Sequence, residues 1–91
     1  MQRTVKHSAN PSFWACYKHL PVSVQNLADK NFELLKTNPN HPSLHLKKVG
    51  GYWSVRVSRK YRALGVEMDK NLIWFWIGTH SEYDRLLMGL A

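Results

Sequence analysis

Apolar residues in the first part of the chain recur at the spacing of helices. Asn10 followed by Pro11 is a typical helix start, because asparagine caps free backbone N–H groups and proline needs no N–H at the first helical position. We therefore predict a short helix over residues 11–19. One side of this helix is apolar and is expected to face the core. That side carries Phe13, Trp14, Cys16, Tyr17 and Leu20.

A second helix is predicted over residues 22–37, after the break at Leu20 and Pro21. Asn31 interrupts its apolar face, and the sequence offers no reason for this. The prolines at positions 39 and 42 end the helix, because proline cannot donate a backbone hydrogen bond and the residue before it disfavours helical geometry. The apolar face consists of Val24, Leu27, Ala28, Phe32, Leu34 and Leu35.

From residue 44 onward the period of the apolar residues changes to two, which is typical of strands. Leu44 and Leu46 alternate with polar residues, and two glycines at 50–51 separate them from another alternating run over residues 52–58. The two runs predict a hairpin. In the second run the apolar side has Trp53, Val55 and Val57. The other side is polar and is expected to be open to solvent, with Tyr52, Ser54, Arg56 and Ser58.

Two more strands are predicted over residues 61–68 and 72–78. The last one is apolar throughout and is therefore expected to lie inside the sheet. A short terminal helix follows, with a capping pattern from Ser81 to Asp84 and apolar residues at helical spacing from Tyr83 onward. Residues 3–7 are predicted to add a strand at one edge.

Together these elements predict a single α+β domain over residues 1–91. We expect a small antiparallel β-sheet of three to five strands, with two N-terminal helices packed on one face and a short C-terminal helix. A chain of 91 residues has the length of one domain.

The chain is basic, with 13 Lys and Arg against 6 Asp and Glu and a formal net charge of +7. Such a charge attracts phosphate backbones and acidic protein segments. The single cysteine, Cys16, cannot close an intramolecular disulfide and is interpreted as a small core residue. No apolar run has the length of a secretory signal or a membrane span. We expect a cytoplasmic protein with no membrane partner.

Metal and cofactor chemistry find little support in the sequence. His41 and His45 straddle Pro42, and no helix places both imidazoles on one side. Glycine-rich phosphate loops and nucleophile motifs are also missing from the sequence. We therefore expect no metal and no small-molecule cofactor.

The remaining chemistry lies in a set of cations and in a titratable pair after the last strand. In an antiparallel meander these positions lie near one another. Cleavage of RNA by its own 2′-hydroxyl needs a group that takes a proton, a cation that stabilises the charge on phosphorus, and an acid for the leaving oxygen. Histidine, arginine and tyrosine can supply all three. The candidate catalytic residues are Arg56, Arg62, His80 and Tyr83.

These candidates also have structural interpretations. Arg62 could pair with a nearby carboxylate, Glu67 or Asp69. Tyr83 could be the first core residue of its helix, and His80 could be a polar loop residue. The sequence leaves both kinds of interpretation open.

Several short segments carry a resemblance to a known family. They are LLKTNP at 34–39, YWSVRV at 52–57, YRALGV at 61–66 and WIGTHSEY at 76–83. With the order of elements, they resemble the RelE/ParE superfamily of bacterial type II toxins, which includes the mRNA interferases RelE, YoeB, YafQ and HigB. The resemblance implies a small antiparallel sheet with two helices on one side and a catalytic groove on the other.

The resemblance also implies an activity and a partner. Ribonuclease members cut mRNA on the ribosome by 2′-hydroxyl attack, and a cognate antitoxin protein holds them inactive. By position, Arg56 matches a phosphate-binding cation and Arg62 the arginine that stabilises the phosphorane. His80 matches the proton-transfer position, and Tyr83 the tyrosine that orients a base or helps as acid. The implied RNA-binding residues are Lys47, Lys48, Arg56, Arg59 and Lys60.

The chain departs from the family pattern in two places. Ser54 stands where RelE-like members have a lysine, and no carboxylate matches the glutamate base of YoeB-like members. The roles of acid and base therefore stay open. Two alternatives also stay open: a ParE-like inhibitor of DNA gyrase that is not a nuclease, and a catalytically degenerate module that binds RNA or protein.

Overall fold

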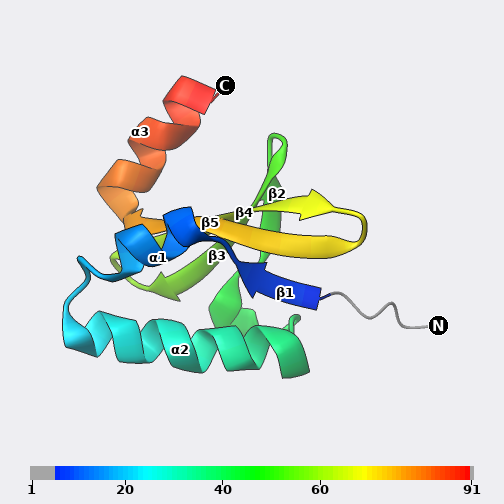
Figure 1. Ribbon diagram of the computed structural model, residues 1–91, viewed down its shortest axis with the longest axis horizontal. Coiled ribbons are helices and arrows are strands. Elements are labelled where there is room, and N and C mark those ends of the chain that lie inside the picture. The colour runs from blue at the N-terminus through cyan, green and yellow to red at the C-terminus, as the bar shows by residue number, and fades with distance from the viewer. Residues whose placement is uncertain (1–5, 91) are drawn as a thin grey trace.

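Figure 1 shows a computed structural model of the chain, which describes residues 6–90. The order of its elements is a strand, two helices, a short 3₁₀ helix, four strands and a terminal helix, which confirms the predicted α+β class. In chain order they are β1 (Lys6–Ala9), α1 (Pro11–Tyr17), α2 (Val22–Thr37), η1 (Pro42–Leu44), β2 (Lys47–Val49), β3 (Tyr52–Ser58), β4 (Tyr61–Met68), β5 (Asn71–Thr79) and α3 (His80–Leu90).

Within residues 6–90 the strands form a five-stranded sheet in the order β1-β5-β4-β3-β2. Strands β2 to β5 make the expected antiparallel meander, and β5 is interior, as predicted. The edge strand β1 pairs parallel to β5, so the sheet is mixed rather than purely antiparallel. This edge strand was predicted over residues 3–7. It begins at Lys6 in the structure, and residues 1–5 lie outside the described part.

The predicted hairpin begins later than its alternation suggested. Leu44 does not lie in a strand but ends η1, where it is fully buried. Pro42 supplies the first residue of this turn, and Nδ1 of His41 accepts the backbone N–H of Ser43 at 3.2 Å. The cap and the proline therefore override the two-residue period, and strand β2 starts only at Lys47.

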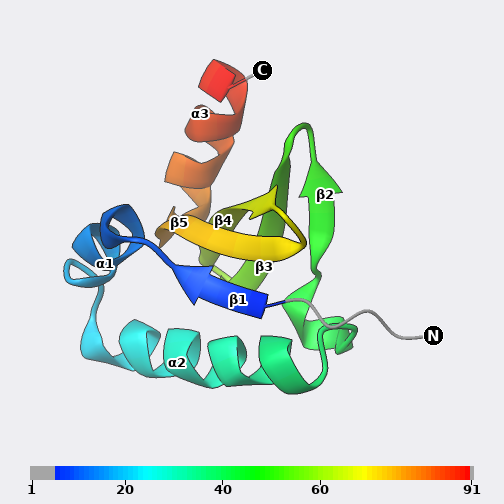
Figure 2. The same ribbon diagram turned by 45° about the vertical axis from the view of Figure 1, so that its right-hand side comes forward.

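Helices α1 and α2 pack on one face of the sheet, as Figures 1 and 2 show. Two apolar residues that are expected in this layer are only partly covered by it, since Trp14 is 45% exposed and Leu27 is 41% exposed. The buried core is made by Phe13, Val24, Ala28, Leu35, Leu44, Val55, Val57, Ala63, Leu72, Trp74 and Ile77.

Asn31, which interrupts the apolar face of α2, has a structural purpose. The register of β3 against β4 shifts between Arg56 and Ser58, so Val57 is an extra residue in β3. Asn31 Nδ2 donates to the backbone carbonyl of Val57 at 2.8 Å. The polar side chain thus joins α2 to the irregular point of the strand, where a bulge disturbs the ladder of hydrogen bonds.

The second face of the sheet is not open along its whole length, contrary to the prediction. Tyr83 of α3 is buried, and its hydroxyl donates to Oγ of Ser54 at 2.8 Å. Ser54 is only 2% exposed for this reason. Its cross-strand partner Leu64 is fully buried as well. Helix α3 therefore covers the middle of a face that is polar when judged from the sequence of β3 alone.

The capping residues of α3 differ from the predicted pair, Ser81 and Asp84. Oγ1 of Thr79 accepts the backbone N–H of Glu82 at 3.2 Å, and Glu82 Oε1 accepts the backbone N–H of Thr79 at 2.9 Å. This is a reciprocal capping box set two residues earlier in the chain. The bonds that the Glu82 carboxylate accepts from the backbone N–H and the hydroxyl of Thr79 hold its pKa below the usual range. The helix therefore begins directly where β5 ends.

Removal of the Asn31 side chain tests its role at the bulge. Asn31→Ala is expected to lower the free energy of unfolding by about 1–2 kcal/mol more than Asn26→Ala, because it leaves the Val57 carbonyl without its donor. Asn26 is exposed in the same helix, so both variants gain the same helix propensity. Chemical denaturation measures the difference, and equal losses in the two variants would contradict the assignment.

Candidate active site

Two arginines lie directly opposite each other on neighbouring strands. Arg56 of β3 is the register partner of Arg62 of β4. Within residues 6–90 neither guanidinium comes within 4.0 Å of a carboxylate, so the interpretation that pairs Arg62 with Glu67 or Asp69 is wrong. Glu67 instead accepts Nε1–H of Trp53 at 3.1 Å. Like charges in opposite positions repel, so this pair is unfavourable for the folded chain by itself.

Arg62 is fixed in place by the backbone. Its Nη1 donates to the carbonyl of Ser58 at 2.6 Å and to that of Tyr61 at 2.9 Å. Partial burial and the charge of Arg56 lower the pKa of the Arg62 guanidinium, which stays protonated at neutral pH. A guanidinium has five N–H donors. Donors on Nε and Nη2 thus remain for an anion after Nη1 has closed the turn.

The start of α3 lies beside the turn between β3 and β4. The backbone N–H of His80 donates to the carbonyl of Lys60 at 2.7 Å. This bond brings His80 to the turn that carries the exposed side chains of Arg59 and Lys60. The sequence prediction that these positions lie near one another is therefore confirmed at the level of geometry.

Tyr83 connects α3 to the middle of β3. It is 6% exposed, as its interpretation as a core residue expected. Its ring lies 5.6 Å from the ring of His80, and its hydroxyl is occupied by the buried bond to Ser54. The Tyr83 phenol is therefore better placed to hold His80 than to move a proton itself.

Asp84 is a candidate residue that the sequence analysis missed. Its Oδ2 lies 3.1 Å from Nδ1 of His80, one helical turn away, and both side chains are partly exposed. The charge of Asp84 opposes the lowering of the Arg62 pKa that burial and Arg56 cause. The signal was the four-residue spacing of His80 and Asp84. Treating Asp84 as a capping residue hid it.

The predicted RNA-binding lysines divide between the two faces. Lys47 lies opposite Ser54, hence on the same face as Arg56. Lys48, the next residue, lies on the other face, where its Nζ is 5.9 Å from the Trp53 ring. The structure therefore brings Lys47 to the face of the arginine pair and leaves Lys48 on the other face.

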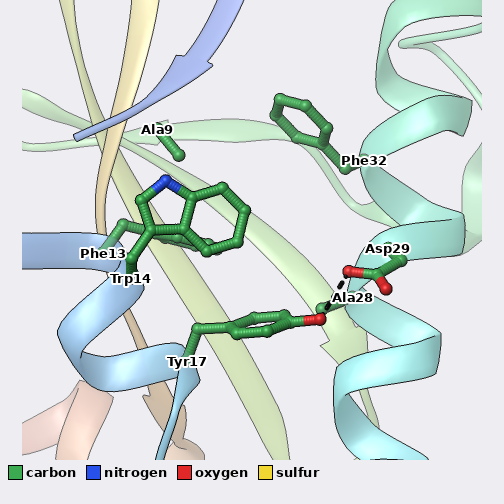
Figure 3. A pocket seen from close by; sticks show the side chains of 7 residues that line it. All are labelled: Ala9, Phe13, Trp14, Tyr17, Ala28, Asp29 and Phe32. Carbon is green, nitrogen blue, oxygen red and sulfur yellow. Dashed lines mark hydrogen bonds between the residues drawn. The ribbon is translucent and has the colours of Figure 1, made fainter. Parts of the chain in front are cut away.

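A separate apolar pocket lies between α1 and α2, away from the arginine pair (Figure 3). Trp14 and Phe32 face it from the two helices, and the Tyr17 hydroxyl donates to Oδ1 of Asp29 at 2.8 Å at its rim. The bond to Asp29 raises the pKa of Tyr17. This pocket has no cation among its lining residues and is not part of the candidate active site.

Among residues 6–90 no group of three or more His, Cys, Asp and Glu side chains has a geometry suited to a metal ion. No helix in the same residues is long and apolar enough to cross a membrane.

Comparisons with known proteins give a family and a fold. The sequence model of the ParE-like toxin domain matches residues 23–85. No curated protein sequence matches the chain. Among solved structures, the archaeal RelE–RelB complex from Pyrococcus horikoshii OT3 matches with a TM-score of 0.68 and 14% identity, covering 85% of this chain and 96% of that one.

Two further structures are similar to the same extent. The DinJ–YafQ toxin–antitoxin complex of E. coli matches with a TM-score of 0.65 and 16% identity over 88% of this chain and 97% of that one. The YoeB dimer from Staphylococcus aureus matches with a TM-score of 0.64 and 14% identity over 86% and 99%. At these identities the likeness concerns the fold.

Removal of the Asp84 carboxylate tests whether it orients His80. In Asp84→Ala the share of neutral His80 with its proton on Nδ1 is expected to fall by about twofold, because an exposed pair of this kind is worth only about 0.3–0.5 kcal/mol. The ¹⁵N shifts of the imidazole nitrogens, recorded in alkaline solution, report this share.

A charge-matched variant serves as the control for this measurement. Asp69→Asn removes a carboxylate from the turn between β4 and β5, where asparagine tolerates the positive φ. The control is expected to leave the tautomers of His80 unchanged. The same tautomer ratio in wild type and Asp84→Ala would exclude an orienting role.

Proposed function

The chain belongs to the ParE-like toxin family, and we propose that it is the toxin of a toxin–antitoxin pair that cleaves mRNA on the ribosome. The match over residues 23–85 contains all four candidate catalytic residues, Arg56, Arg62, His80 and Tyr83. The RelE/ParE superfamily membership predicted from the sequence is confirmed. An mRNA target on the ribosome places the activity in the cytoplasm.

The observation that carries the proposal is the pair of opposed arginines, with the backbone of His80 bound to the adjacent turn at Lys60. Repulsion between Arg56 and Arg62 is relieved when an anion binds between them, and within residues 6–90 no carboxylate does so. A phosphate group accepts bonds from both guanidinium groups with good geometry. The arrangement therefore favours a phosphodiester over an uncharged ligand.

The reaction that suits this site uses the substrate's own nucleophile. The 2′-oxygen of the ribose attacks the neighbouring phosphorus as its proton leaves, and a phosphorane with additional negative charge forms. The bond to the 5′-oxygen then breaks and that oxygen takes up a proton. The products are a 2′,3′-cyclic phosphate and a 5′-hydroxyl end, and neither metal nor cofactor enters the balance. Preorganised cations stabilise the developing charge on phosphorus.

Each side chain has a distinct role in this proposal. Arg56 and Arg62 bind the phosphate and stabilise the phosphorane. His80 moves the proton, with Nε2 directed to substrate because Nδ1 faces Asp84. Tyr83 positions His80 through its buried bond to Ser54. In this proposal Tyr83 is not the general acid, because its hydroxyl already donates its hydrogen bond to Ser54.

The proposed protein partner is a cognate antitoxin. Structures similar to this chain include the RelE–RelB complex and the DinJ–YafQ toxin–antitoxin complex. The net charge of +7 suits a partner that contributes an acidic segment. Such a segment, bound over the arginine pair, would exclude RNA because its carboxylates would occupy the guanidinium groups that otherwise bind phosphate.

A second candidate is inhibition of DNA gyrase without nuclease activity. The observation that favours it is the family model itself, which describes ParE-like toxins. A binding mechanism of that kind does not require a proton-transfer group beside the two arginines. The catalytically degenerate module remains the third possibility, and a single experiment separates all three.

We expect induction of the chain in bacteria without its antitoxin to stop growth and to produce new mRNA 5′ ends inside translated codons. In His80→Ala the cuts are expected to decrease by about a hundredfold or more, because a proton-transfer group contributes that much to catalysis. Sequencing of 5′ ends alongside growth curves measures both effects.

His19→Ala is the matched control, since His19 is an exposed histidine far from the arginine pair in sequence and lies just after α1. It is expected to keep both arrest and cuts. Arrest without cuts would contradict the nuclease and support a gyrase-type target. Absence of arrest in the wild type would support the degenerate module.

A further inference from the structure

An irregularity in β5 places two consecutive aromatic residues on one face of the sheet. Side chains of a regular strand alternate between faces, but the register of β5 passes from Trp74 opposite Gly65 to Trp76 opposite Leu64. Phe75 is therefore an extra residue, and a bulge of this kind lets neighbouring side chains share a face. The backbone carbonyl of Phe75 accepts the hydroxyl of Ser12.

The positions of Phe75 and Trp76 confirm which face they share. The ring of Phe75 lies 5.6 Å from that of Tyr52, edge to face, and Tyr52 lies on the Arg56 side of β3. The indole of Trp76 lies over Gly78, where a Cβ would meet it at 2.5 Å. Gly78 is the register partner of Arg62, so the indole reaches the edge of the arginine pair.

Tyr52, Phe75 and Trp76 together form what we call the aromatic surface. We propose that it stacks the unpaired bases of an RNA strand whose phosphate binds at Arg56 and Arg62. The inference rests on the proposed function, since it takes RNA as the ligand of the arginine pair. It adds the part of the substrate that is recognised and the residues that recognise it.

Burial and charge favour this use over a packing role. All three rings are partly exposed, whereas the aromatic residues of the core, Phe13 and Trp74, lie in the layer of α1 and α2. Proteins bind single strands by combining a cationic track with aromatic side chains, because every base has a face that stacks. An apolar protein segment would cover the rings equally well, but it would leave the adjacent arginine pair without an anion.

The dimensions suit a short stretch of RNA. Tyr52 and Arg56 are four residues apart along β3, roughly 13 Å. Sheet surfaces of this kind stack about two or three bases on their aromatic side chains. The aromatic surface therefore reads bases on one side of the bound phosphate only, which gives the strand a direction across the sheet.

The test compares two RNA probes on the full chain by fluorescence anisotropy. One is a short single-stranded RNA with 2′-O-methyl groups, which prevent cleavage. The other has the same backbone with abasic positions in place of the bases. Wild type is expected to bind the first probe about tenfold or more tightly, since each stacked base contributes roughly fivefold or more in affinity and the surface stacks more than one.

Phe75→Leu and Trp76→Leu are expected to lose this preference for bases while binding to the abasic probe stays the same. Phe75→Tyr keeps an aromatic ring and is expected to retain the preference. Trp14→Leu removes an exposed indole from α1, on the other layer, and is expected to change neither affinity. Tyr52→Leu tests the surface from a different strand if a change in β5 impairs folding.

Equal affinity of wild type for the two probes, or an unchanged preference in all of Tyr52→Leu, Phe75→Leu and Trp76→Leu, overturns the aromatic surface. A preference that Trp14→Leu also abolishes overturns it too. If an acidic or apolar peptide shields the three rings from solvent and RNA does not, the surface binds a protein partner and the proposal is overturned. None of these results depends on cleavage of RNA. The proposed nuclease activity is tested separately, by the mapping of new mRNA 5′ ends.

Discussion

The pairing of β4 with β5 is the interaction on which the rest of the molecule depends. It runs from Tyr61 opposite Thr79 to Met68 opposite Asn71 and crosses the centre of the sheet. The other edge of β5 pairs with β1, and β5 continues directly into α3 at Thr79. The same ladder therefore supports the helical layer on one face and holds the start of α3 at the turn that carries Lys60.

The site retains an electrostatic cost that the fold does not remove. Opposed arginines destabilise a sheet, and the bonds from Arg62 to the carbonyls of Ser58 and Tyr61 offset only part of this by satisfying one nitrogen. Replacement of either cation by a neutral residue would favour the isolated fold. Two partly buried guanidinium groups without a carboxylate partner among residues 6–90 are suited to a ligand that supplies negative charge.

Much of the fold is predictable from local sequence patterns. Features that depend on contacts between distant segments are not. The helix at 22–37 and the strands at 52–58 and 61–68 match to the residue, because apolar period and turn chemistry act within each segment. Two overlapping capping patterns, Thr79 with Glu82 and Ser81 with Asp84, cannot be separated until the end of β5 is known. The burial of Ser54 under Tyr83 joins residues 29 positions apart. The four catalytic candidates were found from residue chemistry and resemblance, but the partners Asp84 and Asn31 needed the fold.

The absence of a loop between Thr79 and His80 in the described chain has an evolutionary consequence. Each residue of a helix turns about 100°, so one insertion at this junction would rotate His80 away from its turn and would also move Tyr83 out of its buried place over Ser54. Lineages can lengthen the turn between β2 and β3 at little expense. The junction of β5 and α3, in contrast, does not accommodate a change of length, because one inserted residue would disturb the capping box and the buried Tyr83 together.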